Sequence, residues 1–224
     1  MEPEAPIPAF EVALEKELAA HHLTILGGFH SDVDDSLPDW ARTVLLIGPA
    51  EPGFWKHFTA QKEWQDGLPD PMDRWSKRVL DAIADKFDGR ALFPFGDAPY
   101  HPFYSWALRT GQIWRSPVQL LIHAKQGLMV SFRGALVLKE AIHTTASTKP
   151  CLDCTQPCLS ACPANALTQE AYDVPTCHRF LDTASGKECL SGGCHVRRAC
   201  PVSQAYARLP EQSAYHMSRF HRAE

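Results

Sequence analysis

Two segments of the N-terminal half place hydrophobic residues at helical spacing. In residues 8–22 the apolar positions share one face, and residues 71–87 begin with an Asp-Pro pair that is typical of a helix start. Shorter helices are expected over residues 52–64 and 102–110. The two longer stripes consist of Phe10, Leu14 and Leu18, and of Met72, Trp75, Val79 and Ile83. Both stripes predict amphipathic helices that pack against a core.

Strand patterns lie between these helices. Residues 43–47 form a continuous apolar run, which predicts a buried strand. Residues 91–95 predict a short strand at the edge of a sheet. Pro94 excludes a central position, because it has no backbone N–H for hydrogen bonding to a neighbouring strand. Residues 118–122 are largely apolar, and residues 128–138 place alternate apolar side chains on one face; across the loop that ends at Gly127, the two segments predict a β-hairpin.

A polar stretch over residues 143–150 lacks periodicity and ends in proline. It predicts a domain boundary. We expect an α+β fold in which a sheet-and-helix domain occupies residues 1–145, a small second domain follows over 146–210, and 211–224 form a tail.

Composition limits the classes of function. The 224 residues are 45% hydrophobic and 21% charged, with a formal net charge of -4. This balance gives no electrostatic attraction to nucleic acid or anionic membranes. The first residues resemble no signal peptide, and no apolar run reaches the ~18 residues of a membrane span. These features predict a cytoplasmic protein that binds neither membrane nor nucleic acid.

All eight cysteines lie between residues 151 and 200. The first four form the run C-x2-C-x3-C-x3-C-P, and the second half also ends in Cys-Pro. Cytosolic thiols are kept reduced, so clustered cysteines favour metal over disulfides, and the Cys-Pro ending favours iron–sulfur clusters over zinc. Eight thiolates divide into two sets of four, as two 4Fe–4S clusters require. The candidate ligands are Cys151, Cys154, Cys158, Cys162, Cys177, Cys189, Cys194 and Cys200.

Three other interpretations of the cysteines stay open. Two zinc sites of four thiolates would also use all eight. A single cluster with four spare thiols would fit the irregular second half, and disulfides are the third alternative. His178 and His195 lie beside cysteines, but neither is assigned as a ligand.

The cysteine pattern resembles the iron–sulfur module of epoxyqueuosine reductase, in its run from Cys151 to Pro163, its lone Cys177 and its final Cys200-Pro201. Reductive dehalogenases carry a related module. The resemblance implies a ferredoxin-like domain with two 4Fe–4S clusters and crossed ligands. One cluster would be held by Cys151, Cys154, Cys158 and Cys200, and the other by Cys162, Cys177, Cys189 and Cys194. The family's last stretch is tighter than the spacing here.

The N-terminal domain carries a looser likeness. The segments 96–99, 106–114 and 120–122 resemble those of the reductase, and the pattern from Ile122 to Leu138 resembles the cobalamin-processing CblC protein. Both families bind cobalamin on a domain related to flavin-dependent nitroreductases. The likeness therefore implies bound cobalamin, with FMN or FAD as the next choice.

The same likeness implies individual site residues. Asp97 is the candidate catalytic proton donor, although it lies two residues before Pro99 where the family's Asp lies three before its Pro. The candidate cofactor-binding residues are Trp114, Arg115, Ser116 and Arg133. The reductase has a glycine and a lysine at the positions of Ser116 and Pro117.

Three functions follow from these patterns. The first is an oxidoreductase of the epoxyqueuosine reductase type without its tRNA-binding domain, in which clusters pass single electrons to a cofactor or small-molecule substrate on the N-terminal domain. The second is a ferredoxin-type electron carrier without its own substrate. The third is a structural or regulatory metal module. The first two require an electron-donor protein as a redox partner.

Overall fold

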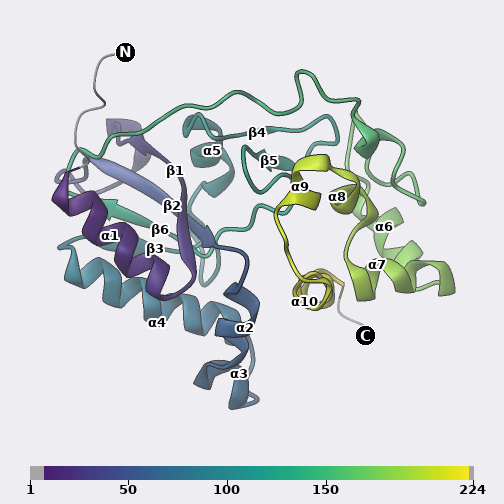
Figure 1. Ribbon diagram of the computed structural model, residues 1–224, viewed down its shortest axis with the longest axis horizontal. Helices are drawn as coiled ribbons and strands as arrows, with labels where there is room; N and C mark the ends of the chain where they lie inside the picture. Colours follow the sequence, from purple (N-terminus) through teal and green to yellow (C-terminus); the bar gives the residue numbers. More distant parts are fainter. Residues whose placement is uncertain (1–7, 222–224) are drawn as a thin grey trace. The chain divides into compact units, whose positions relative to one another are not determined.

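The structure is a computed structural model that describes residues 8–221. The chain forms two compact units. The first contains the residues up to Thr110 together with Ser131–Thr145, and the second contains Gly111–Val130 together with the chain from Ala146 onward. Residues 111–130 therefore belong to the unit that carries the cysteines. The fold is α+β (Figure 1).

The first unit is built on a four-stranded antiparallel sheet with the order β1-β2-β6-β3. The strands are β1 (Leu23–His30), β2 (Thr43–Pro49), β6 (Gly134–Leu138) and β3 (Arg90–Leu92). Every residue of β2 and β6 is buried, so both faces of these central strands are covered. This explains the continuous apolar run of β2. The expected edge position of the 91–95 segment is confirmed by β3.

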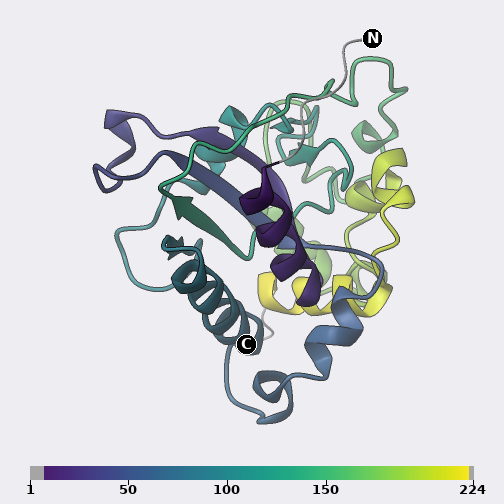
Figure 2. The same ribbon diagram turned by 60° about the vertical axis from the view of Figure 1, so that its left-hand side comes forward.

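Helices cover the sheet of the first unit. The expected helices are confirmed as α1 (Ala9–Ala20), α4 (Pro71–Lys86) and α5 (Phe103–Arg109), whereas the segment after Pro52 divides into α2 (Phe54–Thr59) and α3 (Lys62–Gln65). Figure 2 shows α1 and α4 side by side. An ion pair of 2.5 Å between Lys86 and Glu17 joins them.

The core of the first unit is aromatic where α2 meets α4. Trp75 is fully buried, and its ring centroid lies 5.6 Å from that of Phe54 and 5.7 Å from that of Phe58. Such contacts contribute about 0.5–1.5 kcal/mol per pair beyond the burial of area. The apolar stripe of 71–87 is thus core packing, as its spacing predicts.

The expected hairpin of residues 118–122 and 128–138 is wrong. β5 (Leu121–His123) pairs with β4 (Ile113–Arg115), whereas β6 pairs with β2 and β3 in the other sheet. The alternation in 128–138 was misleading because β6 is a central strand with two buried faces. The turn after β5 closes on itself, through reciprocal backbone hydrogen bonds of 3.0 Å between His123 and Gly127.

The second unit joins this small β4-β5 hairpin to short helices. These are the 3-10 turns Pro157–Leu159 and Ala184–Gly186, and the helices α6 (Val174–Leu181), α7 (Lys187–Gly192), α8 (His195–Ala199), α9 (Pro201–Ala205) and α10 (Pro210–Phe220). α10 packs against α7. The apolar core includes Val118, Ile122, Leu128, Leu167 and Val196. No helix of the described chain is both long enough and apolar enough to cross a membrane.

Candidate metal centre

All eight cysteine thiols are free, and all belong to the second unit. Cys177 lies in α6 and Cys189 in α7, while Cys194 and Cys200 flank α8. The other four lie in the loop from 151 to 162. Among residues 8–221, no group of three or more His, Cys, Asp or Glu side chains is arranged to hold a single metal ion.

One set of four thiols surrounds a cavity of about 380 Å³. This volume falls within the ~300–1,000 Å³ that small-molecule and cofactor sites occupy. Apolar side chains and prolines form much of the remaining wall, among them Ile122, Leu128, Pro157 and Val202. The thiols that line it are those of Cys151, Cys154, Cys158 and Cys200.

Tertiary packing brings Cys200 to the other three. α8 packs against the 3-10 turn that carries Cys158, and Cys200 ends α8. Burial raises the pKa of the Cys158 thiol, and the nearby thiols of Cys151 and Cys200 raise it further. Burial likewise raises the pKa of Cys151, against a lowering by Lys149. Three buried thiols and the half-buried Cys154 lie close enough to disfavour one another's charge, so the set is suited to a shared cationic group.

The other four thiols form a second set, because they too lie close enough to affect one another's pKa. Burial raises the pKa of Cys177, and the thiols of Cys194 and Cys162 add to the rise. Burial also raises the pKa of Cys189, with further contributions from Cys194 and Cys177. α6 and α7 pack together, which brings Cys177 and Cys189 near each other.

Hydrogen-bond donors point at the sulfurs of both sets. The backbone N–H of Gln156 donates to Cys154 Sγ at 3.3 Å, and that of Ala166 donates to Cys162 Sγ at 3.3 Å. The Tyr172 hydroxyl donates to the sulfur of Cys177, which lowers the pKa of this thiol and contributes, after burial, to raising that of Tyr172. Donation to a sulfur favours its negatively charged form.

Cationic side chains near the second set are held in place. Arg198 donates to the carbonyl of Gly193 at 3.0 Å and pairs with Glu188 at 2.9 Å, and it lowers the pKa of the Cys189 thiol. Arg197 donates to the carbonyl of Leu128. Both guanidinium groups therefore have structural contacts in addition to their charge.

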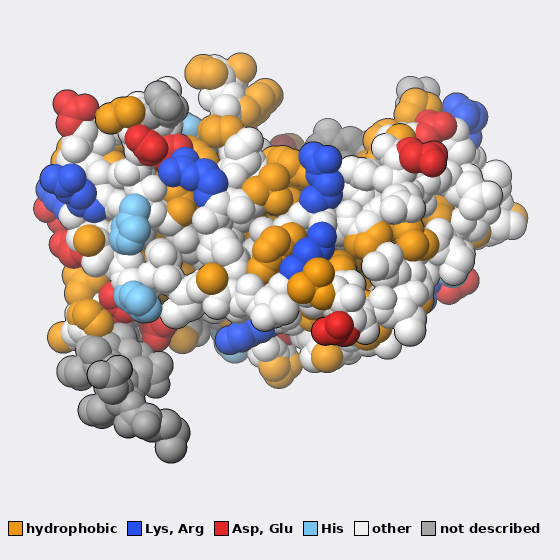
Figure 3. Space-filling model, turned by 90° about the horizontal axis from the view of Figure 1, so that it is seen from above, with side chains coloured by type: hydrophobic (Ala, Val, Ile, Leu, Met, Phe, Trp, Pro, Cys, Tyr) orange, Lys and Arg blue, Asp and Glu red, His pale blue; other side chains and the backbone are white. Residues whose placement is uncertain are grey.

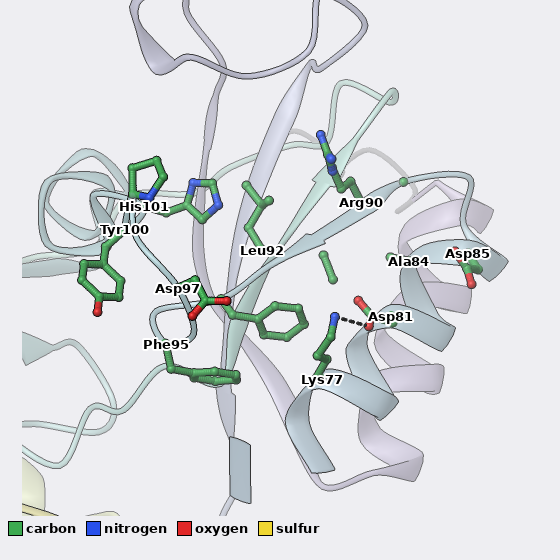
Figure 4. Close-up of a pocket in the computed structure, with 14 residues that line it drawn as sticks. Lys77, Asp81, Ala84, Asp85, Arg90, Leu92, Phe95, Asp97, Tyr100 and His101 are labelled. Carbon is green, nitrogen blue, oxygen red and sulfur yellow. Dashed lines mark hydrogen bonds and ion pairs between the residues drawn. The ribbon is translucent and has the colours of Figure 1, made fainter. Parts of the chain in front are cut away.

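Asp97 lies in the first unit, on the loop after β3. It is exposed and lines a cavity of about 550 Å³, to which Arg90, Tyr100 and His101 also contribute. Figure 4 shows Asp97 and His101 on this loop, with the ion pair between Lys77 and Asp81 on α4. Burial lowers the pKa of His101, and the charge of Arg90 lowers it further.

The four candidate cofactor-binding residues are divided between the units. Arg133 belongs to the first unit, where its guanidinium lies 3.6 Å from Asp73 and 3.3 Å from the Ser131 hydroxyl, outside the wall of the Asp97 cavity. Trp114, Arg115 and Ser116 belong to the second unit.

Within the second unit, the Trp114 side chain packs against the core that contains three of the thiols. Arg115 is exposed, whereas Ser116 is buried and lines the thiol cavity. Sequence reasoning assigned Ser116 to a corrinoid site and gave Tyr172 no role. The Ser116 contact has no local signal, because it depends on segments distant in the chain, whereas Tyr172 lies only five residues before Cys177.

The chain matches no family model, no curated protein and no solved structure.

Proposed function

We propose that the second unit holds two 4Fe–4S clusters and transfers single electrons. The observation that carries this proposal is the division of eight free thiols into two sets of four, one of which lines a cavity. These sets are the ones that the resemblance to epoxyqueuosine reductase implies.

The residues around the first set fit a cluster. Four thiols supply the ligands, apolar walls limit access of water, and N–H donors stabilise charge on sulfur. Ser116 adds a buried hydroxyl that has no hydrogen-bond partner in the described part of the chain. A cluster bound here would supply one-electron redox chemistry, and the protein would tune its potential through these hydrogen bonds and the burial.

The second set fits a cluster through similar contacts. Cys162 and Cys189 accept hydrogen bonds at sulfur from the backbone N–H groups of Ala166 and His195, and Cys177 accepts one from the Tyr172 hydroxyl. Arg198 supplies nearby positive charge. Two centres in one small unit would let an electron enter at one and leave at the other.

We propose the first unit as the site of the electron acceptor, in an oxidoreductase of the epoxyqueuosine reductase type. The cavity beside Asp97 has a volume suited to a small molecule or part of a cofactor. The resemblance favours cobalamin, with FMN or FAD second. A carrier without its own substrate would have no need of such a cavity.

The partners and location follow from this proposal. A separate electron-donor protein would reduce the clusters, and the cytoplasm would keep unligated thiols reduced. The described residues drawn in Figure 3 show positive and negative side chains dispersed over that face, without an extended basic field. This surface gives no reason to expect nucleic acid as a partner.

The acceptor is tested by titrating cobalamin, FMN and FAD separately into the anaerobically purified protein and recording absorption spectra. We expect a saturable spectral change with cobalamin, weakened in an Asp97→Asn variant and retained in an Asp39→Asn variant on another loop. If none of the three binds, the carrier interpretation replaces the enzyme.

A further inference from the structure

Ser116 is held in a tight turn directly after β4. Its N–H donates to the carbonyl of Leu120 at 2.8 Å, and its carbonyl accepts from the N–H of Gln119 at 3.2 Å. Both backbone polar groups are therefore used within the turn. The turn fixes the backbone from which the side chain projects.

The side chain of Ser116 is buried but unsatisfied. The residue is 4% exposed, and its Oγ has no hydrogen-bond partner among residues 8–221. Burying a hydroxyl without a partner is unfavourable, and such groups are rare in folded proteins. An unsatisfied hydroxyl at this position therefore points to a bound group that accepts a hydrogen bond from it.

The surroundings indicate what that group is. Ser116 lines the same cavity as the thiols of Cys151, Cys154, Cys158 and Cys200. Apolar side chains such as Ile122 and Leu128 form neighbouring parts of the wall. A 4Fe–4S cluster held by these four thiols would present negatively charged sulfur atoms to the cavity wall.

We infer that the Ser116 hydroxyl donates a hydrogen bond to a sulfur of the first cluster and raises its reduction potential. This inference rests on the proposed function. Reduction adds negative charge to the cluster, so a hydrogen bond to sulfur is stronger in the reduced state and favours it. Ser116 tunes the electron affinity of the site and is not a ligand.

The test is a redox titration of the anaerobically purified full chain, followed by electron paramagnetic resonance. The signal that disappears in Cys158→Ala identifies the first site. In Ser116→Ala we expect that signal to appear at a lower potential, with a roughly two- to tenfold smaller equilibrium constant for reduction. The signal of the second site stays unchanged.

Two further variants make the test specific. Ser116→Thr keeps a hydroxyl and should retain the potential of the original protein. Ser160→Ala removes an exposed hydroxyl between two cysteines and should change neither signal. An unchanged first potential in Ser116→Ala with full iron content would overturn the inference, and so would loss of the first cluster in that variant. A protein without clusters would instead overturn the proposed function.

Discussion

The hydroxyl of Ser203 accepts a hydrogen bond from the backbone N–H of Leu128, with 2.8 Å between nitrogen and Oγ. Ser203 lies in α9, the helix that begins directly after Cys200, and Leu128 is part of the cavity wall. The two segments are so close that a Cβ on Gly127 would lie 2.6 Å from Ser203 Oγ. This contact ties the turn after β5 to the helix that follows the last cysteine.

The first prediction concerns this contact. Ser203→Ala would leave the buried N–H of Leu128 without its acceptor, at a cost of about 1–3 kcal/mol in the free energy of unfolding. Denaturant unfolding of the apoprotein measures it. Ser218→Ala, which removes an exposed hydroxyl of α10, should cost less than about 0.5 kcal/mol. Equal effects of the two changes would show that the Ser203 contact is not structural.

The division of the thiols predicts a reciprocal loss of clusters. Cys158→Ala should remove the first cluster and leave the second visible by electron paramagnetic resonance. Cys177→Ala should do the opposite, because Cys177 lies with Cys162 and Cys194. Each variant should retain about half of the iron. Equal damage to both signals in both variants would contradict the division.

The hydrogen bond from Tyr172 to Cys177 leads to a prediction about the reduction potential of the second cluster. Tyr172→Phe removes the hydroxyl that donates to Cys177, so charge on this sulfur is less well stabilised. We expect the second potential to fall by on the order of 50 mV, since a tenfold change in a one-electron equilibrium corresponds to about 59 mV. Tyr104→Phe, on α5 of the first unit, is the control and should leave both potentials unchanged. A shift in the first potential alone would contradict the assignment of Tyr172.

The stability of the first unit is predicted to depend on pH through Glu63. Glu63 is buried and accepts hydrogen bonds from Arg78 at 2.5 and 3.1 Å. The hydrogen bonding from Arg78 holds the pKa of Glu63 below its usual range. A carboxyl whose pKa is lower in the folded state stabilises above its unfolded pKa, about 4.3, and this contribution disappears as the pH falls through its folded pKa.

Glu63→Gln should therefore lower the free energy of unfolding by about 1–2 kcal/mol at neutral pH and flatten its decline in acid. Urea unfolding at a series of pH values from 7 to 3 measures both effects. Asp81→Asn alters an exposed pair with Lys77 and should change the curve little. Parallel curves for Glu63→Gln and the original protein would refute the role given to Glu63.

Much of the first unit could be predicted from periodicity. Met72, Trp75 and Val79 are buried along α4 as their spacing indicates. β1 escaped prediction because Gly27 and Gly28 interrupt its pattern, with a register shift between Ile25 and Gly27. The prediction of a hairpin over residues 118–138 was wrong, because β6 is buried on both faces between β2 and β3 and does not pair with β5.

The site shows a similar limit. The spacing from Cys151 to Cys158 indicates that these thiols lie close together, because they share one loop. The approach of Cys200 to that loop depends on the packing of α8, and the position of Ser116 depends on a turn about 35 residues earlier in the chain. Such contacts have no local pattern from which they could be predicted.

The central claim is tested most directly by the metal content of the anaerobically purified chain. For two 4Fe–4S clusters we predict a brown protein with about eight iron atoms and about eight acid-labile sulfides per chain. A colourless protein that contains zinc and no labile sulfide would contradict the account.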